Sequence, residues 1–478
     1  MPDPLPKILM VASEATPFSK TGGLADVLGS LPKALHRRGH DVGVVLPLYT
    51  SAKPYTATAD QLLKSYPVPM GRRTVSIDVR RATLEGVHYY LIDNPPLYDR
   101  PGIYGDRSGD YGDNALRFGL LNHSALAVIR HLFRPDIIHT HDWQTGMLAF
   151  LTRMHFAGDP TFAGMKVLFT IHNLGYQGLF TRGHLAEMGL DDTYYRPDLL
   201  EHFGAVNLLK GGILSAHALG TVSPNYAKEI QTPEFGFGLD GLLRARSTDL
   251  HGILNGVDYS VWSPATDRQI PERYDYDDLS GKRVCKEALL REFHLSMEHV
   301  ERPVIGIVSR FADQKGFDLI AQVAWEFVHE DIYFVVLGSG DERYENLFRA
   351  MAAARPDRIG VRTVYDERLA HMIEAGSDMF LMPSRYEPCG LNQIYSLRYG
   401  TVPVVRAVGG LDDTIDEETG FKFRDYSGRA LLASLHQALA AYRDREHWTA
   451  MMQRGMKKDY SWDASAAQYS DLYARLTG

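Results

Sequence analysis

The chain has 478 residues, of which 45% are hydrophobic and 23% are charged, and its formal net charge is −8 at pH 7. This length and apolar content exceed what one ordinary core needs and are typical of two domains. The negative net charge argues against nucleic acid or an anionic membrane as the main partner, and no apolar run reaches the roughly 18 residues that span a bilayer. We therefore expect a soluble protein in which any anionic ligand is held by a local cluster of cations.

The two cysteines, Cys285 and Cys389, are too few for a disulfide framework and lack the spacing of metal ligands. The first residues, MPDPLPKILMVAS, lack a basic start followed by a long apolar run and a cleavage site, and they predict a first core strand instead. We therefore expect a cytoplasmic protein with reduced cysteines.

Short β-branched runs alternate with helical segments along both halves of the chain. The runs are KILMVAS, DVGVVLPLY, PDIIHTH, KVLFTIHN and HALGTVS in the first half, and VIGIVSR, YFVVLGSG, IGVRTVY, DMFLMPS and VPVVRAV in the second. This alternation predicts parallel sheets, and the apolar character of the strands predicts helices on both sheet faces. Thr74 to Asp93 adds an antiparallel hairpin that turns at Glu85-Gly86. We expect an α/β fold with two Rossmann-like domains that face each other across a cleft.

A polar stretch rich in Asp, Pro and Tyr, from Gly252 to about Tyr276, predicts the domain boundary. We place the first domain at residues 1–252 and the second at residues 253–460. The last segment, about 461–478, has helical spacing at Ala467, Tyr469, Leu472 and Leu476, and we expect it to pack back on the first domain.

Ligands of open α/β sheets bind beyond the carboxyl ends of strands, so the residues that follow each strand are the candidates for a site. The first strand leads into Ser19-Lys20-Thr21-Gly22-Gly23 and then a helix. A glycine pair at a helix start exposes backbone N–H groups, and Lys20 adds charge, which favours a phosphate. The alternative is a tight turn that only saves space.

The string from Gly236 to Gly241 fits G-x-G-x-x-G. A dinucleotide fingerprint must follow a strand, whereas the preceding SPNYAKEIQTPEF predicts a helix capped by Ser223 with Pro224 at its first position. We therefore interpret this string as a flexible loop.

Two neighbouring strands deliver imidazoles and a carboxylate to one edge: PDIIHTH ends in His139 and His141 before Asp142, and KVLFTIHN ends in His172 and Asn173. We favour sugar recognition, because neutral His, Asn and Asp supply mixed donors and acceptors. The second interpretation is one buried, hydrogen-bonded His with the others solvated. A metal site ranks last, because no further cluster supplies ligands.

In the second half, Arg310 and Lys315 follow the strand VIGIVSR on one loop. The bidentate guanidinium of Arg and the ammonium of Lys can both bind a diphosphate. The alternative interpretation is a basic loop that is only solvated.

Glu387 lies in the loop SRYEPCGLNQ, which opens a helix. A carboxylate there can hold sugar hydroxyls or stabilise a positive ring, and the alternative is a helix N-cap or first-turn acid. We interpret Cys389 as a packing residue, because it lacks an evident base. A second glycine pair follows Val408 and precedes another helix.

Taken together, KTGGLADVLGSLPKAL, HTHDWQTG, TIHNLGYQG, ILNGVD, SRFADQKG and SRYEPCGLNQIYSLRYGT resemble bacterial glycogen synthases and plant starch synthases, in order over essentially the whole chain. The resemblance implies a GT-B fold and transfer of glucose from ADP-glucose to the non-reducing end of an α-1,4-glucan such as glycogen, with retention of configuration. It implies that the first domain serves the acceptor and the second binds the donor. It implies no metal and no cofactor, since the nucleotide sugar is a substrate.

The resemblance also implies roles for individual residues. The catalytic residues would be His172, Arg310, Lys315 and Glu387; the donor-binding residues would be Lys20, Gly22, Gly23, Asp142, Asn173, Tyr365, Cys389, Gly390, Leu391 and Asn392; and possible cleft or acceptor residues would be Asp26, Tyr98 and Asn255. Among these, Lys20, the glycine pair, Arg310 and Lys315 would meet the diphosphate, and Tyr365 would stack on adenine.

Three positions depart from the patterns of related enzymes. Tyr395 stands where related retaining transferases carry the second glutamate of E-x7-E, Gln144 stands where a His is frequent, and Val408 stands where Thr is usual. The alternatives are a sugar-nucleotide epimerase of the same fold, another GT-B glucosyltransferase that uses UDP-glucose, and a glucan-binding protein without activity. The residues leave the choice between ADP and UDP, and the oligomeric state, open.

Overall fold

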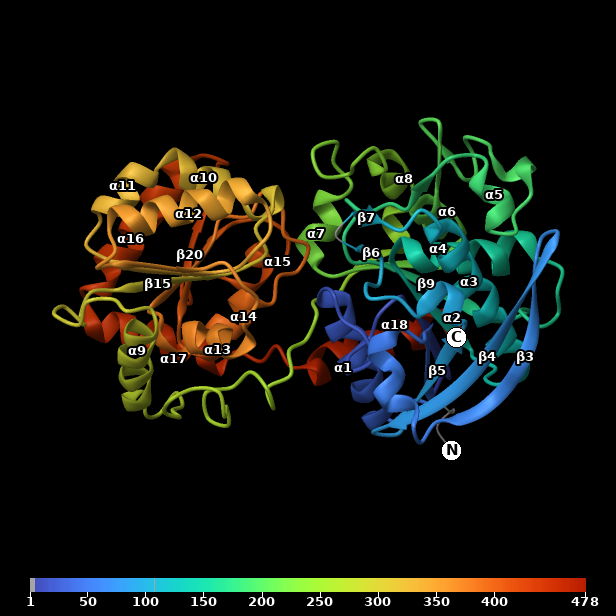
Figure 1. Cartoon of the computed structure of the whole chain (residues 1–478), viewed down its shortest axis with the longest axis horizontal. Coiled ribbons are helices and arrows are strands. Elements are labelled where there is room, and N and C mark those ends of the chain that lie inside the picture. The colour runs from blue at the N-terminus through green and yellow to red at the C-terminus, as the bar shows by residue number, and fades with distance from the viewer. Residues whose placement is uncertain (1–4, 107) are drawn as a thin grey trace. The chain divides into compact units, whose positions relative to one another are not determined.

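The computed structural model describes residues 5–106 and 108–478 of the chain, which fold into two compact units (Figure 1). Unit 1 comprises the chain up to residue 222, residues 227–256 and residues 462–478, whereas unit 2 comprises residues 223–226 and 257–461. The predicted boundary at residue 253 lies a few residues before the passage from Gly256 to Val257. The chain thus returns to unit 1 with its last helix, α18 (Trp462–Thr477).

The main sheet of unit 1 runs in the order β14-β13-β9-β8-β1-β2-β5-β4-β3. Its strands are β1 (Ile8–Val11), β2 (Val42–Pro47), β3 (Asp60–Met70), β4 (Arg73–Leu84), β5 (Val87–Asp93), β8 (Ile137–His141), β9 (Lys166–Ile171), β13 (Ala218–Thr221) and β14 (Leu250–Gly252). All neighbours from β14 to β5 are parallel, and β3, β4 and β5 are antiparallel. The hairpin predicted at Glu85-Gly86 is confirmed, with both residues at positive φ (49° and 84°), as its tight turn requires.

Strand β3 was not predicted from the sequence. Its sequence DQLLKSYPVPM contains two prolines, which lack the N–H that a central strand must donate. The strand is possible because it lies at the edge of the sheet, where only β4 pairs with it.

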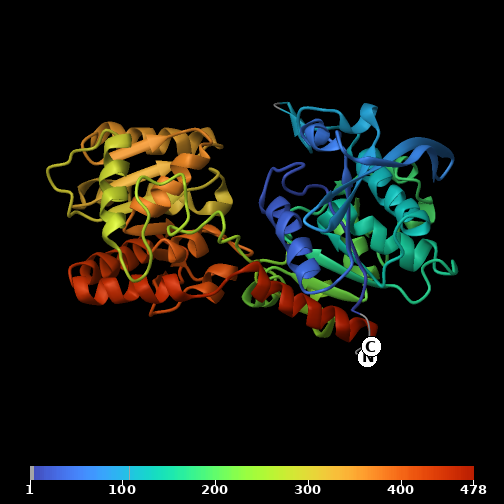
Figure 2. The same cartoon turned by 90° about the horizontal axis from the view of Figure 1, so that it is seen from below.

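Helices of unit 1 cover the sheet, and α18 completes one of the covering layers (Figure 2). The longer helices are α1 (Gly23–Arg37), α3 (Asn114–His131), α4 (Asp142–Phe150) and α6 (Leu208–Ser215). Trp462, Tyr469, Leu472 and Tyr473 of α18 are buried in the same core as β1, β2 and α1. The apolar face of α18 therefore includes Tyr473, which the predicted spacing left out.

Short elements connect this framework. They are α2 (Pro95–Tyr98), β6 (Gly105–Asp106), β7 (Gly109–Asp110), β10 (Leu179–Phe180), α5 (His184–Glu187), β11 (Glu201–His202), β12 (Ala205–Asn207), α7 (Pro224–Glu229) and α8 (Asp240–Ala245). Helix α7 is capped as predicted, since the Ser223 hydroxyl accepts the N–H of Tyr226 at 2.9 Å. The string that begins at Gly236 follows this helix rather than a strand, so it is not a dinucleotide fingerprint.

Unit 2 contains a fully parallel sheet in the order β17-β16-β15-β18-β19-β20. Its strands are β15 (Val304–Val308), β16 (Tyr333–Leu337), β17 (Ile359–Arg362), β18 (Met379–Met382), β19 (Val402–Arg406) and β20 (Phe421–Phe423). Counted along unit 2, this is the order 3-2-1-4-5-6 of the dinucleotide-binding Rossmann fold. The order reverses between β15 and β18.

Two helical layers enclose the sheet of unit 2 (Figure 1). Helices α10 (Phe317–Gln322), α11 (Ala324–His329), α12 (Glu342–Ala354) and α16 (Gly428–Tyr442) cover one face, and α9 (Ser280–Glu292), α13 (Glu367–Gly376) and α14 (Asn392–Arg398) cover the other. Helices α15 (Gly409–Thr414) and α17 (Arg445–Lys457) complete the unit. Among the described helices of the chain, none combines the length and the apolar character needed to cross a bilayer.

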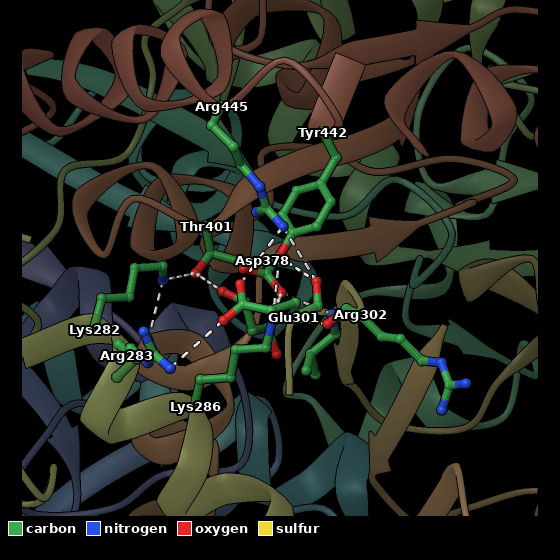
Figure 3. Close-up of polar contacts among 12 residues, drawn as sticks. Lys282, Arg283, Lys286, Glu301, Arg302, Asp378, Thr401, Tyr442 and Arg445 are labelled. Atoms are coloured by element: carbon green, nitrogen blue, oxygen red, sulfur yellow. Dashed lines mark hydrogen bonds and ion pairs between the residues drawn. The ribbon is translucent and has the colours of Figure 1, made fainter. Parts of the chain in front are cut away.

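A buried polar network lies at the amino ends of the strands of unit 2 (Figure 3). Lys286 of α9 donates to Asp378 at 2.7 Å, and Asp378 also accepts the N–H of Val304 at 2.8 Å, at the start of β15. Lys282 donates to the Thr401 hydroxyl at 2.7 Å and to two backbone carbonyls, and burial lowers its pKa to about 8. These contacts anchor α9 at the amino edge of the sheet, away from its carboxyl edge.

Candidate active site

Most of the predicted site residues lie at the carboxyl ends of the strands that flank the point where each sheet reverses its order, whereas His172 and Asn173 follow β9 and Tyr365 follows β17. In unit 2 these strands are β15 and β18, and in unit 1 they are β1 and β8. Loops that leave such neighbouring strands diverge to opposite faces of the sheet and open a crevice for a ligand.

In unit 2, Lys315 and Glu387 form an ion pair. Lys315 follows β15, Glu387 follows β18, and the ammonium donates to Oε2 of Glu387 at 2.6 Å. Their side chains are 22% and 7% exposed. Gly316 makes this approach possible: its φ is 71°, and a Cβ there would lie 1.9 Å from the carbonyl oxygen of Pro383.

Two further contacts hold Glu387 in place, one at its carboxylate and one at its backbone. The Ser384 hydroxyl donates to its Oε2 at 3.1 Å, and the backbone N–H of Gly410 donates to the Glu387 carbonyl at 3.1 Å. The N-cap position of α14 is Leu391, so the interpretation of Glu387 as a helix cap is wrong. The sequence analysis did not single out Ser384, although it lies two residues after the end of β18 and three residues before Glu387.

The remaining predicted residues of unit 2 surround this pair in different ways. Asn392 starts α14 and donates from Nδ2 to the carbonyl of Val308 at 2.6 Å, which ties the end of β15 to the loop after β18. Cys389 is buried, as expected of a packing residue, while Gly390 and Leu391 lead from it into α14. Arg310 is exposed on the loop after β15.

Tyr365 lies on the loop between β17 and α13. Its side chain is 83% exposed, which is unusual for a tyrosine and leaves a ring face for stacking.

In unit 1, the glycine loop is held by a carboxylate that sequence reasoning missed. Glu14, which is 3% exposed, accepts the backbone N–H groups of Thr21 at 2.5 Å and Gly22 at 3.3 Å, and the hydroxyl of Tyr104 at 3.0 Å. Burial raises the pKa of this carboxyl, and the hydrogen bonds oppose the rise. Glu14 follows β1 closely, so the rule of strand carboxyl ends would have singled it out.

These contacts limit what the loop offers to an anion. Because Glu14 takes the N–H groups of Thr21 and Gly22, the N–H groups at the start of α1, beginning with Gly23, are the ones left for a phosphate. Lys20 is salt-bridged to Asp26 of α1 at 2.7 Å, with side chains 48% and 31% exposed.

The fold itself does not demand glycine at either position of the first pair. Gly22 has an extended backbone, and a Cβ added to Gly22 or Gly23 would meet nothing within 4 Å. The second pair differs, because a Cβ on Gly409 or Gly410 would lie 2.0 or 2.1 Å from a carbonyl of the Glu387 loop. Open space at a glycine suggests that the absent side chain leaves room for something outside the chain.

The histidines that follow β8 and β9 separate into two environments. His139 has one ring nitrogen 2.7 Å from the Tyr473 hydroxyl of α18 and the other 2.7 Å from the Thr170 hydroxyl, so it has a structural role. His141 is also fully buried. The interpretation that one histidine is buried and the others are solvated is therefore wrong for His141. His141 Nδ1 lies 3.0 Å from Nε2 of His172, which is partly exposed.

Asp142 joins the ends of β8 and β9. It has a φ of 57°, a left-handed conformation that costs a non-glycine residue about 1 kcal/mol or more. Its carboxylate accepts the backbone N–H of His172 at 2.7 Å. Burial raises its pKa to about 7, against the opposing effect of the N–H groups of His172 and Asn173. The strained backbone thus aims the carboxylate at the residues that border the predicted sugar site.

Two of the possible acceptor residues lie in the interior. Tyr98 is fully buried and donates its hydroxyl to the backbone of Arg117 at 2.8 Å, so the structure does not support a direct ligand contact. Asn255 is 7% exposed, and its Oδ1 has no hydrogen-bond partner among the described residues.

The three residues that differ from the patterns of related enzymes each pack within their own unit. Tyr395 stacks on Trp262 with ring centroids 4.0 Å apart, Gln144 is 6% exposed on α4, and Val408 is 3% exposed before α15. At the position where related enzymes carry the second glutamate, this chain therefore has a tyrosine that is stacked on a tryptophan.

Known protein families and relatives resemble this chain over most of its length. Residues 7–245 match the family model described as starch synthase catalytic domain, and residues 294–454 match that of glycosyl transferases group 1. The chain is 50% identical to a glycogen synthase of Koribacter versatilis over 98% of both chains. It is 49% identical to a glycogen synthase of Anaeromyxobacter sp., over 98% of this chain and 99% of the relative.

Solved structures are similar as well. The catalytic domain of starch synthase IV from Arabidopsis thaliana, bound to ADP and acarbose, has a TM-score of 0.89 and 33% identity over 99% of both chains. A sucrose-phosphate synthase from Thermosynechococcus elongatus has a TM-score of 0.63 and 18% identity over 98% of both chains, which is a likeness of fold.

The chain is a glycosyltransferase of the GT-B fold. This class is identified by the two α/β units, which carry polar residues at the carboxyl ends of their strands, and by the similar families and solved structures. Within this class, the chain belongs to the family of glycogen and starch synthases.

Proposed function

We propose that this chain transfers glucose from ADP-glucose to the non-reducing end of an α-1,4-glucan such as glycogen, with retention of the anomeric configuration. The observation that carries the proposal is the pair of Lys315 and Glu387, 2.6 Å apart in unit 2. In a nucleoside diphosphate glucose, the terminal phosphate is bonded to C1 of the sugar. A site for it therefore needs a cation for the phosphate next to an acceptor for sugar hydroxyls.

The adenine nucleotide has separate support. The related starch synthase IV is bound to ADP, and the exposed ring of Tyr365 offers this chain a surface on which a purine can stack. A protein that only binds glucans needs neither feature. The proposed donor is therefore ADP-glucose rather than UDP-glucose.

For the reaction we propose substitution on one face of the sugar. The bond from C1 to the diphosphate oxygen breaks as the 4-hydroxyl of the acceptor attacks from the same side and gives its proton to the departing ADP. Arg310 and Lys315 stabilise the charge that develops on the diphosphate. Tyr395 in place of a second carboxylate favours this route over one with a carboxylate nucleophile.

We further propose that the protein acts in the cytoplasm. Cys285 and Cys389 are buried and form no disulfide in the described structure, which suits a reducing compartment.

The test is an assay of purified protein with ADP-glucose or UDP-glucose, each with and without glycogen. We expect ADP release that rises with added glycogen, and α-linked glucose in the product by proton NMR. Isomerised donor formed without glycogen would replace the proposal with an epimerase. Equal or faster turnover of UDP-glucose would overturn the donor assignment.

A further inference from the structure

A hydrogen bond between two histidines connects the interior of unit 1 to the proposed sugar site. His141, at the end of β8, is 0% exposed, whereas His172, which follows β9, is partly exposed, so His172 is the residue of the two that a ligand can reach. The bond joins Nδ1 of His141 to Nε2 of His172 at 3.0 Å. The position of its proton determines whether Nδ1 of His172 donates or accepts.

Both rings are neutral near pH 7. Burial lowers the pKa of His172 to about 3. Burial also lowers the pKa of His141 well below its ordinary value, and the neighbouring His139 and His172 lower it further. Each ring therefore carries one N–H, and only two arrangements of the pair place one proton between Nδ1 of His141 and Nε2 of His172.

The second nitrogen of His141 distinguishes these arrangements. Its Nε2 is buried and has no hydrogen-bond partner among the described residues. If His172 donated, His141 would carry its proton on Nε2 as a buried N–H without an acceptor. If His141 donates from Nδ1, only a lone pair on Nε2 lacks a partner, and buried N–H groups without acceptors are the rarer case in proteins.

The His141 ring is held so that it cannot easily exchange its two nitrogens. It packs on His139 with centroids 4.0 Å apart at an interplanar angle of 36°. His139 is itself fixed at both nitrogens, by Tyr473 and by Thr170.

We propose that His141 is a positioning residue that donates to Nε2 of His172 and thereby fixes His172 as the Nδ1–H tautomer, a hydrogen-bond donor toward a substrate oxygen. This inference rests on the proposed function, because the substrate oxygen belongs to the transferred sugar. In this form His172 cannot serve as a base through Nδ1. The C-terminal helix contributes through Tyr473 by holding His139 against His141.

Neutron diffraction from crystals of the full chain exchanged into D2O near pH 7 tests the tautomer directly. We expect deuterium on Nδ1 of His141 and on Nδ1 of His172. Deuterium on Nε2 of His172 would overturn the proposal. The result does not depend on activity, so a protein that fails the transferase assay but shows this tautomer contradicts the proposed function alone.

Variants test the consequence for turnover. His141→Phe keeps a ring but removes the donor, and we expect kcat to fall about tenfold or more, as for the loss of an ordered hydrogen bond. His141→Asn retains an amide donor near the position of Nδ1 and should restore most of kcat. In a His172→Ala background, His141→Phe should have no further effect, because His141 acts through His172.

His123 provides the matched control. It is another buried histidine of unit 1, bonded to the carbonyl of Met188 at 3.0 Å and outside the pair. His123→Phe should leave kcat within about twofold, since the hydrogen bond and the packing that it alters lie outside the pair. If the double variant lost kcat by the product of the two single losses, His141 would act independently of His172, and the positioning role would be overturned.

Discussion

Lys315 shows how a single side chain depends on its surroundings. Its ammonium is mostly shielded from water and lies against a carboxylate that is 7% exposed. Charges in such a setting act through a lower effective dielectric than surface charges do, so this lysine can stabilise a departing diphosphate more than an exposed lysine would.

For Lys315→Ala we expect kcat to fall by about 10²-fold or more, the scale of losing one group that stabilises transition-state charge. The melting temperature should also fall, because Glu387 is left buried without its cation. Steady-state kinetics with ADP-glucose and glycogen measure the first effect, and calorimetry measures the second. Lys458→Ala, which removes a half-exposed ion pair with Asp416, should change neither strongly. Near-normal turnover of Lys315→Ala would rule out its assignment.

The raised pKa of Asp142 predicts that the free energy of unfolding depends on pH. Burial raises its pKa in the folded chain to about 7, from 3.8 for an ordinary aspartate. Between these two pH values the folded chain binds more protons than the unfolded chain, so this residue's contribution to stability is present below the lower value and is lost as pH rises through the higher one.

Asp142→Asn removes this titration and keeps an oxygen for the N–H of His172. We expect the variant to match the wild type near pH 4 and to become relatively more stable toward pH 8, by a few kcal/mol, because each tenfold change in proton affinity corresponds to about 1.4 kcal/mol. Urea unfolding across this pH range measures the difference. A difference that stays constant with pH would contradict the raised pKa.

At the scale of elements, the two glycine pairs at helix starts look alike in sequence but serve different needs. The pair before α1 faces open space, whereas the pair at the start of α15 packs against the carbonyls of the Glu387 loop. The fold therefore accounts for the second pair, and our proposal that a phosphate binds at the first pair accounts for the other.

Gly22→Ala and Gly410→Ala separate these explanations. Gly22→Ala should leave the melting temperature within about 1 °C and weaken ADP binding about tenfold or more, because the added methyl occupies the space of the phosphate. Gly410→Ala should lower the melting temperature by several degrees, because its Cβ would lie 2.1 Å from the Cys389 carbonyl. Scanning calorimetry and titration calorimetry with ADP measure both. A destabilised Gly22→Ala that binds ADP normally would assign the first pair to the fold.

Elements were predictable where their signals are local. Strands such as β8 and β15 are short apolar runs followed by polar residues, and the turn at Glu85-Gly86 contains a glycine, which suits positive φ. Strand β3 was not predictable in this way, because its prolines fit only an edge position, and the place of a strand in the sheet is not local information.

At the scale of the whole molecule, the chain closes unit 1 with its last helix. Residues 257–461 form most of unit 2, and α18 then supplies Trp462, Tyr469, Leu472 and Tyr473 to the core of unit 1. The folding of unit 1 therefore depends on residues that follow unit 2 in the sequence.

Deletion of residues 462–478 should prevent unit 1 from folding. Removing four large buried side chains at about 1.5–3 kcal/mol each is comparable to the whole stability of a typical domain. We expect aggregation or loss of one calorimetric transition. Asp463→Ala, which breaks an exposed ion pair with Arg37, is the control and should melt like the wild type. A truncated chain with both transitions intact would contradict this role of α18.

By itself the sequence determined the alternation of strands and helices and the polar residues after each strand, such as Arg310, His172 and Glu387, because periodicity and turn chemistry act over a few residues. Only the tertiary structure decided that Lys315 meets Glu387, 72 positions away, and that Tyr473 meets His139, 334 positions away. The physical reason is strand order: it determines which carboxyl ends are neighbours and which side chains are buried, and it results from packing the whole chain at once.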